Sequence, residues 1–147
     1  MRALASAGAG FLLAVLWFDL MFDVQARGRG VLPAEVLASI SRYYARVTTA
    51  ARPMNRLVPV AMLVTVGALV AEIVRCDLAR WRAIASLLLA LVAIGLALGR
   101  TVRNAVRLGR ASDDAATSSR LARSILHDHV VCFGAIFAVL LLQLIPA

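Results

Sequence analysis

Four long apolar stretches, separated by polar segments, dominate the pattern of the chain. They cover residues 3–22, 57–74, 83–99 and 130–145, and the last has a polar approach from Leu126. Each comes close to the roughly 20 residues that a helix needs to cross about 30 Å of hydrocarbon at about 1.5 Å per residue. The pattern predicts an all-α, integral membrane four-helix up-and-down bundle in a single transmembrane domain over residues 1–147. The spanning helices are expected at approximately residues 3–25, 55–75, 81–107 and 121–145.

The segment between the first two apolar stretches has the pattern of an amphipathic helix, expected over approximately residues 34–52. Pro33 suits the first turn of a helix, and apolar residues recur at helical spacing while Arg42 and Arg46 occupy another face. This pattern favours an additional interfacial helix with its arginines toward lipid phosphates. The alternative is a cytoplasmic extension of the second spanning helix, interrupted at Pro53. The apolar positions are Val36, Ile40, Tyr43, Val47 and Ala51.

Composition agrees with a membrane protein. Hydrophobic residues make up 62% of the chain and the mean hydropathy is +0.86, whereas soluble domains are roughly 45 to 50% apolar. The formal net charge is +8, and every basic residue is arginine. Most arginines lie in the two segments that follow the first and third apolar stretches, and the positive-inside rule places such loops in the cytoplasm. We therefore expect a multi-pass protein of the inner (cytoplasmic) membrane with both termini outward, and no nucleic-acid partner.

The first apolar stretch also has features of a secretory signal, because Arg2 precedes an apolar core and Val24-Gln25-Ala26 resembles a cleavage site. Asp19 and Asp23 would fall between that core and the cleavage point, which favours a retained membrane helix. In the third stretch, Gly95 and Gly99 have the GxxxG spacing that permits close helix approach. This spacing is compatible with a neighbour within the bundle, a homo-oligomer or a larger membrane complex.

Polar residues gather at one depth when they are placed along an up-and-down bundle. Counting along the helices puts Asp19 and Asp23 in the same leaflet as His127 and His129. Because the two acids share a helix face and repel each other, something cationic should lie near them. A metal ion held by Asp19, Asp23, His127 or His129 is one hypothesis. Arginine partners, namely Arg27, Arg56 and Arg103, are the favoured one.

The two histidines point about 200° apart on a regular helix, so one metal ion does not easily bind both. His127 continues along a stripe of small residues, Val131, Gly134 and Ala138, that is compatible with close packing. His129 shares a face with larger residues and is expected to face lipid or a neighbouring subunit. We therefore predict that His127 faces the bundle and that His129 is a bystander.

Three short segments, YYARVTTAARPMN, GRTVRNAVRLG and ARSILHDHVV, give the chain a resemblance to a known family. In this respect it resembles the anthrone oxygenase-like family of small four-helix bacterial membrane proteins. That family tends to have an Asn-Arg-containing segment after its third helix and a Leu-His pair opening its fourth, and these match Arg103-Asn104 and Leu126-His127. The sequence lacks a Trp before Leu126 and has Val130 where the family often has Arg.

The resemblance implies oxidation of an activated aromatic molecule, with the cofactor left open. His127 would be the base, since the ordinary pKa of histidine lies near working pH. Arg103 and Asn104 would stabilise the anion in a water-poor site, and Asp23 or Asp19 would orient the imidazole. A hydrophobic small-molecule substrate would enter from the inner leaflet.

Two further interpretations stay open alongside this oxidoreductase-like enzyme. One is a non-catalytic membrane subunit or assembly factor that binds lipids or partner proteins. The other is a haem- or metal-binding membrane protein in which His127 or His129 is a ligand.

Overall fold

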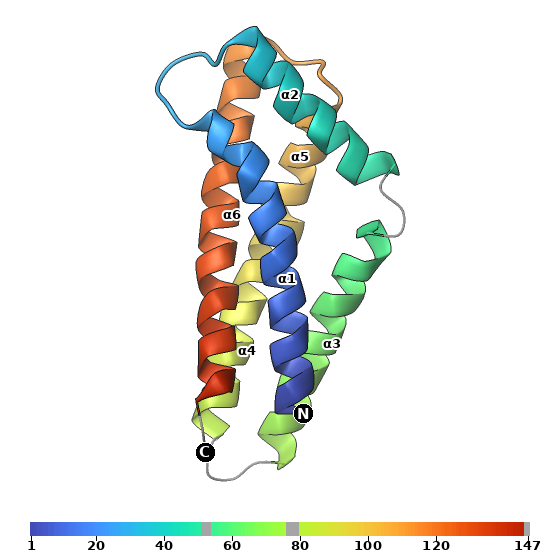
Figure 1. The fold of residues 1–147 in the computed structure, drawn as a ribbon, viewed down its shortest axis with the longest axis vertical. Helices are drawn as coiled ribbons and strands as arrows, with labels where there is room; N and C mark the ends of the chain where they lie inside the picture. The colour runs from blue at the N-terminus through green and yellow to red at the C-terminus, as the bar shows by residue number, and fades with distance from the viewer. Residues whose placement is uncertain (51–53, 76–79, 146–147) are drawn as a thin grey trace.

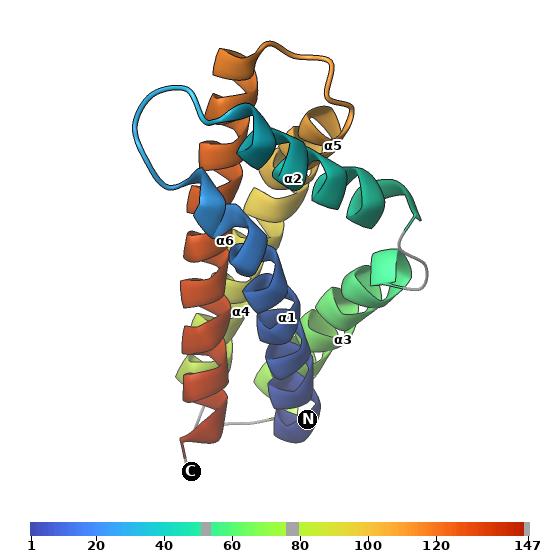
Figure 2. The same cartoon turned by 45° about the horizontal axis from the view of Figure 1, so that its top comes forward.

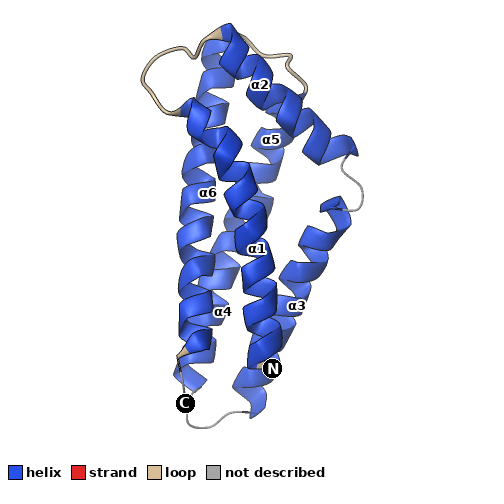
Figure 3. Ribbon diagram, viewed as in Figure 1, coloured by secondary structure: helices blue, strands red, loops and turns tan. Residues whose placement is uncertain are grey.

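The computed structural model describes residues 1–50, 54–75 and 80–145, and its regular elements in those ranges are helices (Figures 1 and 3). Residues 51–53 lie outside the described residues; they include Ala51 of the predicted amphipathic helix and Pro53, where the alternative prediction has an interruption. The α-helices are α1 (Arg2–Asp23), α2 (Ala34–Ala45), α3 (Met54–Arg75), α4 (Arg80–Leu96), α5 (Val102–Gly109) and α6 (Ala115–Leu144). A short 3₁₀ turn, Val24–Ala26, continues α1.

Among the described residues, the bundle is formed by antiparallel spanning helices: α1, α3, α4 with its continuation α5, and α6. Helix α6 packs against α1 and α4, and α3 packs against the same two helices from the other side. Helix α1 begins and helix α6 ends at one end of the bundle, while α2 and α5 lie at the opposite end (Figure 1). We call this second end, which also holds the C-terminal turn of α1 and the first turns of α6, the arginine-rich end. The predicted all-α bundle is confirmed.

The exterior of the bundle is apolar over most of its length. Among the described residues, four segments are long and apolar enough to cross a membrane: Arg2–Ala26, Arg56–Arg75, Arg80–Gly109 and Ala115–Leu144. Large side chains on their outer faces are exposed, with Leu63 at 72% and Phe18 at 61%. In water such a surface would favour association, but lipid solvates it. The chain therefore has the character of a multi-pass membrane protein.

Small residues allow the helices to approach closely inside the bundle. The core between the spanning helices is built largely from alanines, including Ala5 and Ala9 of α1 and Ala90 of α4. A Cβ added at Gly8 would lie 2.1 Å from Thr65 Oγ1 of α3, so glycine is required where these helices cross. Lipid tails are as apolar as leucine, so this tight packing, rather than burial from water, holds the helices together.

Helix α2 crosses the arginine-rich end of the bundle (Figure 2), where it packs against α5 and α6. Its buried residues include Leu37, Ile40 and Tyr44, which belong to a second apolar cluster that contains Leu108 of α5 and Ile125 of α6. The expected amphipathic helix is present as α2. Its apolar face is covered by α5 and α6, because the bundle itself offers an apolar surface there.

Two helix boundaries differ from the sequence-based expectation. Helix α6 begins at Ala115 instead of near residue 121, because the Asp114 side chain caps it by accepting a hydrogen bond from Thr117 N at 2.8 Å. The third spanning helix has a π-helical turn, Ala97–Thr101, between α4 and α5. A π-turn inserts an extra residue per turn and is frequent at functional sites. This one faces the candidate site described next.

Candidate functional site

Five polar side chains from three helices meet at the arginine-rich end. We call them the Asp–His–Tyr network; they are Asp19 and Asp23 of α1, Tyr43 and Tyr44 of α2, and His129 of α6. Asp23 is 0% exposed and Tyr44 is 2% exposed. The sequence brings these residues together because α2 folds back over the end of α1. Residue 129 lies on the buried stripe of α6.

Asp23 is the centre of the network. Its Oδ2 lies 2.6 Å from His129 Nδ1, and its Oδ1 accepts a hydrogen bond from the Tyr44 hydroxyl at 2.5 Å. Both carboxylate oxygens are therefore occupied, and hydrogen bonds of this length to a charged group are among the stronger ones in proteins. The contact fixes the orientation of the imidazole ring. It also makes Nδ1 the nitrogen that carries the proton in neutral His129, which leaves Nε2 with a lone pair.

Asp19 lies on the outer side of the same imidazole. Its Oδ2 is 4.0 Å from His129 Nε2, too far for a hydrogen bond but close enough for electrostatic attraction. Its Oδ1 accepts a hydrogen bond from the Tyr43 hydroxyl at 2.6 Å, and its side chain is 18% exposed. Phe22 stacks on Tyr43 with ring centroids 4.0 Å apart. This edge of the network is thus its partly open side, lined by aromatic rings.

The two tyrosines remain proton donors. Burial raises the pKa of the Tyr44 phenol far above its ordinary value of about 10, and the negative charge of Asp23 raises it further. Burial and the Asp19 carboxylate raise the pKa of Tyr43 in the same direction. A phenol beside a carboxylate resists losing its proton, because deprotonation would place two negative charges together. Helix α2 therefore contributes neutral hydroxyl groups.

A second polar contact adjoins the network. Asp128 is 0% exposed, and its carboxylate forms a two-point contact with Arg100. The Thr101 hydroxyl donates to the same carboxylate at 3.1 Å. Arg100 and Thr101 belong to the π-helical turn, which turns both side chains toward α6. Asp128 therefore has a partner of opposite charge from the π-helical turn, and the neighbouring His129 is left to the acids of α1.

The prediction of which histidine faces the bundle is wrong. The side chain of His127 is 73% exposed, whereas that of His129 is 10% exposed. The buried residues of α6 follow alternating steps of three and four, a spacing that contains residue 129 and excludes residue 127: Ala122, Ile125, His129, Cys132, Ile136, Val139 and Gln143. The small-residue stripe through Gly134 instead faces outward, because a Cβ there would meet nothing within 4 Å.

The other predicted site residues lie around the network without joining it. The amide nitrogen of Asn104 lies 3.3 Å from the Ser124 hydroxyl oxygen and donates to it. Arg103 is exposed and donates to the carbonyl oxygen of Gly99 in its own helix. The favoured arginine partners of Asp19 and Asp23 are also wrong. The basic group beside these acids is the imidazole of His129, and their other partners are the tyrosines.

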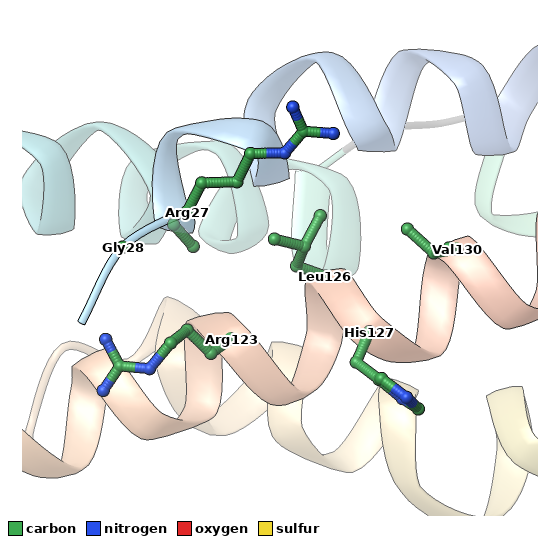
Figure 4. A pocket seen from close by; sticks show the side chains of 7 residues that line it. Arg27, Gly28, Arg123, Leu126, His127 and Val130 are labelled. Carbon is green, nitrogen blue, oxygen red and sulfur yellow. The ribbon is translucent and has the colours of Figure 1, made fainter.

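His127 instead lines a surface pocket of about 340 Å³ on the outer side of α6. Figure 4 shows Arg27, at the end of α1, across from the side chains that α6 contributes. The pocket does not include His129, so it is separate from the Asp–His–Tyr network. Its lining residues are Ala26, Arg27, Gly28, Arg123, Leu126, His127 and Val130.

The acids and histidines at this end do not form a metal site. Across residues 1–50, 54–75 and 80–145, no group of three or more His, Cys, Asp or Glu side chains has an arrangement that could hold a metal ion. Asp19, Asp23 and His129 are near one another, but Asp23 directs both oxygens to protein donors. His127 points away from all three. The predicted metal site at Asp19, Asp23, His127 and His129 is thus not formed as a set.

Sequence reasoning missed the tyrosines and Arg100. A signal for the tyrosines was present, because a buried phenol usually finds a hydrogen-bond partner. Asp19 and Asp23 repeat at the helical spacing of four and needed donors, and Tyr43-Tyr44 is the adjacent pair of donors on the next helix. For Arg100 we see no comparable signal, since the π-helical turn that aims it at Asp128 has no recognised sequence pattern.

Comparisons of the chain with models of protein families, with curated proteins and with solved structures gave no match. The resemblance to the anthrone oxygenase-like family therefore stays a prediction that rests on short segments.

Proposed function

We propose that this chain is a small oxidoreductase-like membrane enzyme in which His129 is the general base, acting on a hydrophobic molecule at the cytoplasmic leaflet. The observation that carries the proposal is the 2.6 Å contact between His129 Nδ1 and Asp23 Oδ2. A base that is oriented through one ring nitrogen presents the other to a substrate proton.

Asp19 supports the proton transfer through its charge. When Nε2 accepts a proton, the imidazole becomes positive, and the Asp19 carboxylate at 4.0 Å stabilises it. Asp23 holds the ring in place, and Tyr44 holds Asp23. Each group therefore has a distinct task. His129 accepts the proton, Asp23 and Tyr44 position it, and Asp19 balances the charge.

The partly open edge of the network suits an aromatic substrate arriving from lipid. Phe18 is exposed at 61% and Phe22 at 36%, on the same end of α1 as Asp19. An aromatic molecule would stack on such rings, in the offset or edge-on geometries that aromatic pairs prefer. Entry through the lipid-facing side of α1 avoids any need for a water-filled cleft.

The resemblance to the anthrone oxygenase-like family supplies the substrate class. An anthrone carries a CH₂ group between two aromatic rings, and loss of one proton to His129 Nε2 leaves an anion delocalised over both rings. Dioxygen then oxidises that carbon to a carbonyl: one oxygen atom enters the product, and the other leaves as water with the two hydrogens of the CH₂ group. Anthrone and dioxygen therefore give anthraquinone and water, with atoms and electrons balanced.

Sidedness follows from the positive-inside rule. The arginine-rich end carries the loops between α1 and α3 and between α5 and α6, so we place it in the cytoplasm of a bacterial cell and the termini outside. The base then lies at the inner leaflet.

The test uses the full chain in lipid nanodiscs with anthrone as the probe, measuring dioxygen uptake and anthraquinone absorbance. We expect His129→Gln to lose activity by about 10²-fold or more, the range for loss of a general base. His127→Gln is the matched control, because it removes an exposed imidazole two residues away and should leave turnover unchanged. Equal activity of His129→Gln and the wild type sinks the role of His129. No wild-type turnover above the protein-free rate counts against the substrate class.

A second candidate function has one observation in its favour. Gly95 and Gly99 are exposed, and a Cβ at either would meet nothing within 4 Å. This surface is open to another helix, as a non-catalytic subunit of a larger membrane complex would require. Purification from native membranes distinguishes the two candidates, because a stable stoichiometric partner protein that is lost in Gly95→Leu favours the subunit.

A further inference from the structure

The pocket beside His127 has a basic rim. Three of its seven lining residues are basic, namely Arg27, Arg123 and His127, and none is acidic. These residues lie at the depth where α1 ends and α6 enters the apolar part of the bundle. A site rich in arginine at that depth attracts negative charge.

The two arginines keep unused hydrogen-bonding capacity. Arg123 donates through Nη1 to the carbonyl oxygen of Gly30 at 2.7 Å, which uses one of its five N–H groups. Arg27 is exposed; its backbone N–H donates to the Val24 carbonyl oxygen, and its guanidinium makes no hydrogen bond or ion pair with the part of the chain that the structure describes. Figure 4 shows Arg27 at the end of α1 opposite α6, with the guanidinium groups of Arg27 and Arg123 extending to different sides of the pocket. A guanidinium fork matches two oxygens of a phosphate group.

The floor of the pocket and the surface beyond it are apolar. Ala26, Leu126 and Val130 complete the lining. From Val130, exposed at 51%, the outer face of α6 continues through Phe137, Leu141 and Leu144, exposed at 46%, 48% and 62%. Residues at these intervals share one helix face. The basic rim is thus joined to an apolar track that follows the spanning helix.

We propose that this pocket binds the headgroup of an anionic phospholipid, with its phosphate at Arg123, its negative charge also attracted by Arg27, and an acyl chain along the Val130 face of α6. The apolar track distinguishes a lipid from a free phosphate, because an inorganic ion gains nothing from Val130 or Phe137. The absence of an acid among the lining residues favours a headgroup with net negative charge over a zwitterionic one, whose ammonium group would find no partner there.

Native mass spectrometry of the detergent-solubilised full chain tests this site, with phosphatidylglycerol and phosphatidylcholine as the probe lipids. We expect the wild type to retain phosphatidylglycerol in preference. Arg27→Gln and Arg123→Gln should each lower that retention about fivefold, the factor that corresponds to one basic residue at an anionic membrane surface. Arg110→Gln is the matched control, because Arg110 is an exposed arginine at the same end that does not line the pocket.

Three results overturn the proposal. The first is an unchanged lipid preference in the double variant, and the second is an equal loss in Arg110→Gln, which would mean general surface charge. The third is saturation by inorganic phosphate at the same concentration as phosphatidylglycerol. Arg27→Gln alone keeps the test decisive if loss of the Arg123 bond to Gly30 disturbs folding. Because His129 does not line the pocket and bound lipid is measured, this result is independent of the enzymatic test.

Discussion

Replacing Tyr44 by phenylalanine isolates one hydrogen bond at the centre of the Asp–His–Tyr network. The change removes a single oxygen atom and leaves Asp23 Oδ1 fully buried without the donor that now lies at 2.5 Å. Water has no access to replace that donor. The expected loss in the free energy of unfolding is about 1.5 to 3 kcal/mol, the usual worth of a hydrogen bond to a charged group.

Tyr43→Phe is the matched control. It removes the same atom from the neighbouring residue, but its acceptor, Asp19, has a side chain that is 18% exposed. Water can therefore take the place of the Tyr43 hydroxyl, and the expected loss is below about 1 kcal/mol. Both variants keep the aromatic ring, so packing against Phe22 and the apolar cluster is preserved.

Equilibrium unfolding in mixed micelles, followed by circular dichroism as the denaturing detergent is increased, measures both losses. A double-mutant cycle with Asp23→Asn then tests whether Tyr44 acts through Asp23, and the coupling should be at least about 0.5 kcal/mol. An equal loss in the two phenylalanine variants would contradict the claim that burial decides the value of the bond. A coupling near zero would mean that Tyr44 stabilises the protein in another way.

The same residue predicts a pH dependence at the alkaline end. Burial raises the pKa of Tyr44 in the folded protein, while in the unfolded chain its pKa is about 10. A raised folded-state pKa gives stability that is fully present below about pH 10 and is lost as the pH rises above that value. Wild-type stability should therefore begin to fall near about pH 10 and continue to fall as the pH rises further, and the fall should be smaller in Tyr44→Phe. Parallel curves for the two proteins would refute the argument.

Two pairs of substitutions test the helix packing and the contact between Arg100 and Asp128. Gly8→Ala should lower the free energy of unfolding by about 1 to 3 kcal/mol through overpacking. Adding Thr65→Ala should restore most of that loss, because it removes the oxygen that the new Cβ would meet. If stability is not restored, another contact limits the packing. Arg100→Gln should lower the unfolding midpoint in detergent more than Arg107→Gln. The first substitution leaves the buried Asp128 without its charged partner, whereas the second leaves Asp113, which water reaches. Equal shifts in the midpoint would contradict this reasoning.

The bundle could be predicted from the sequence because a membrane-spanning helix requires only a sufficiently long apolar run, whatever its exact residues. Any chain that crosses lipid must satisfy its backbone hydrogen bonds internally, so apolar runs of about 20 residues become helices almost regardless of detail. The same reasoning placed Asp19, Asp23 and the two histidines at one end. Depth in the membrane depends only on counting along the helix, and counting is reliable.

Which face of α6 is buried could not be predicted in the same way. In lipid, the outer surface of a helix is as apolar as its core, so hydrophobicity does not distinguish the two. The small-residue stripe through Gly134 was one guide, and it indicated the wrong histidine. The buried stripe through Ile125, Cys132 and Ile136 follows from contact with α1 and α4, which only the folded arrangement reveals.

The pairing of Tyr43 and Tyr44 with the acids of α1 depends on where α2 packs in the folded protein. Helix α2 has the sequence of an amphipathic helix, which can cover either lipid or protein. Its apolar face covers α5 and α6, because Leu108 and Ile125 provide a matching surface. Once α2 is there, Tyr43 and Tyr44 reach the acids of α1. Local pattern therefore predicted the helix, but long-range packing determined what it touches.

The contact between Asp23 and His129 joins residues 106 positions apart, and this separation has a consequence for biosynthesis. During synthesis α1 emerges with Asp19 and Asp23, while the histidine that pairs with them is translated only with the last helix. Until α6 inserts, two carboxylates at the end of an apolar helix lack their imidazole partner and must stay hydrated at the membrane edge. We expect α1 to settle to its final depth only after α6 arrives, so a chain truncated before α6 should leave that end of α1 accessible to quality-control proteases.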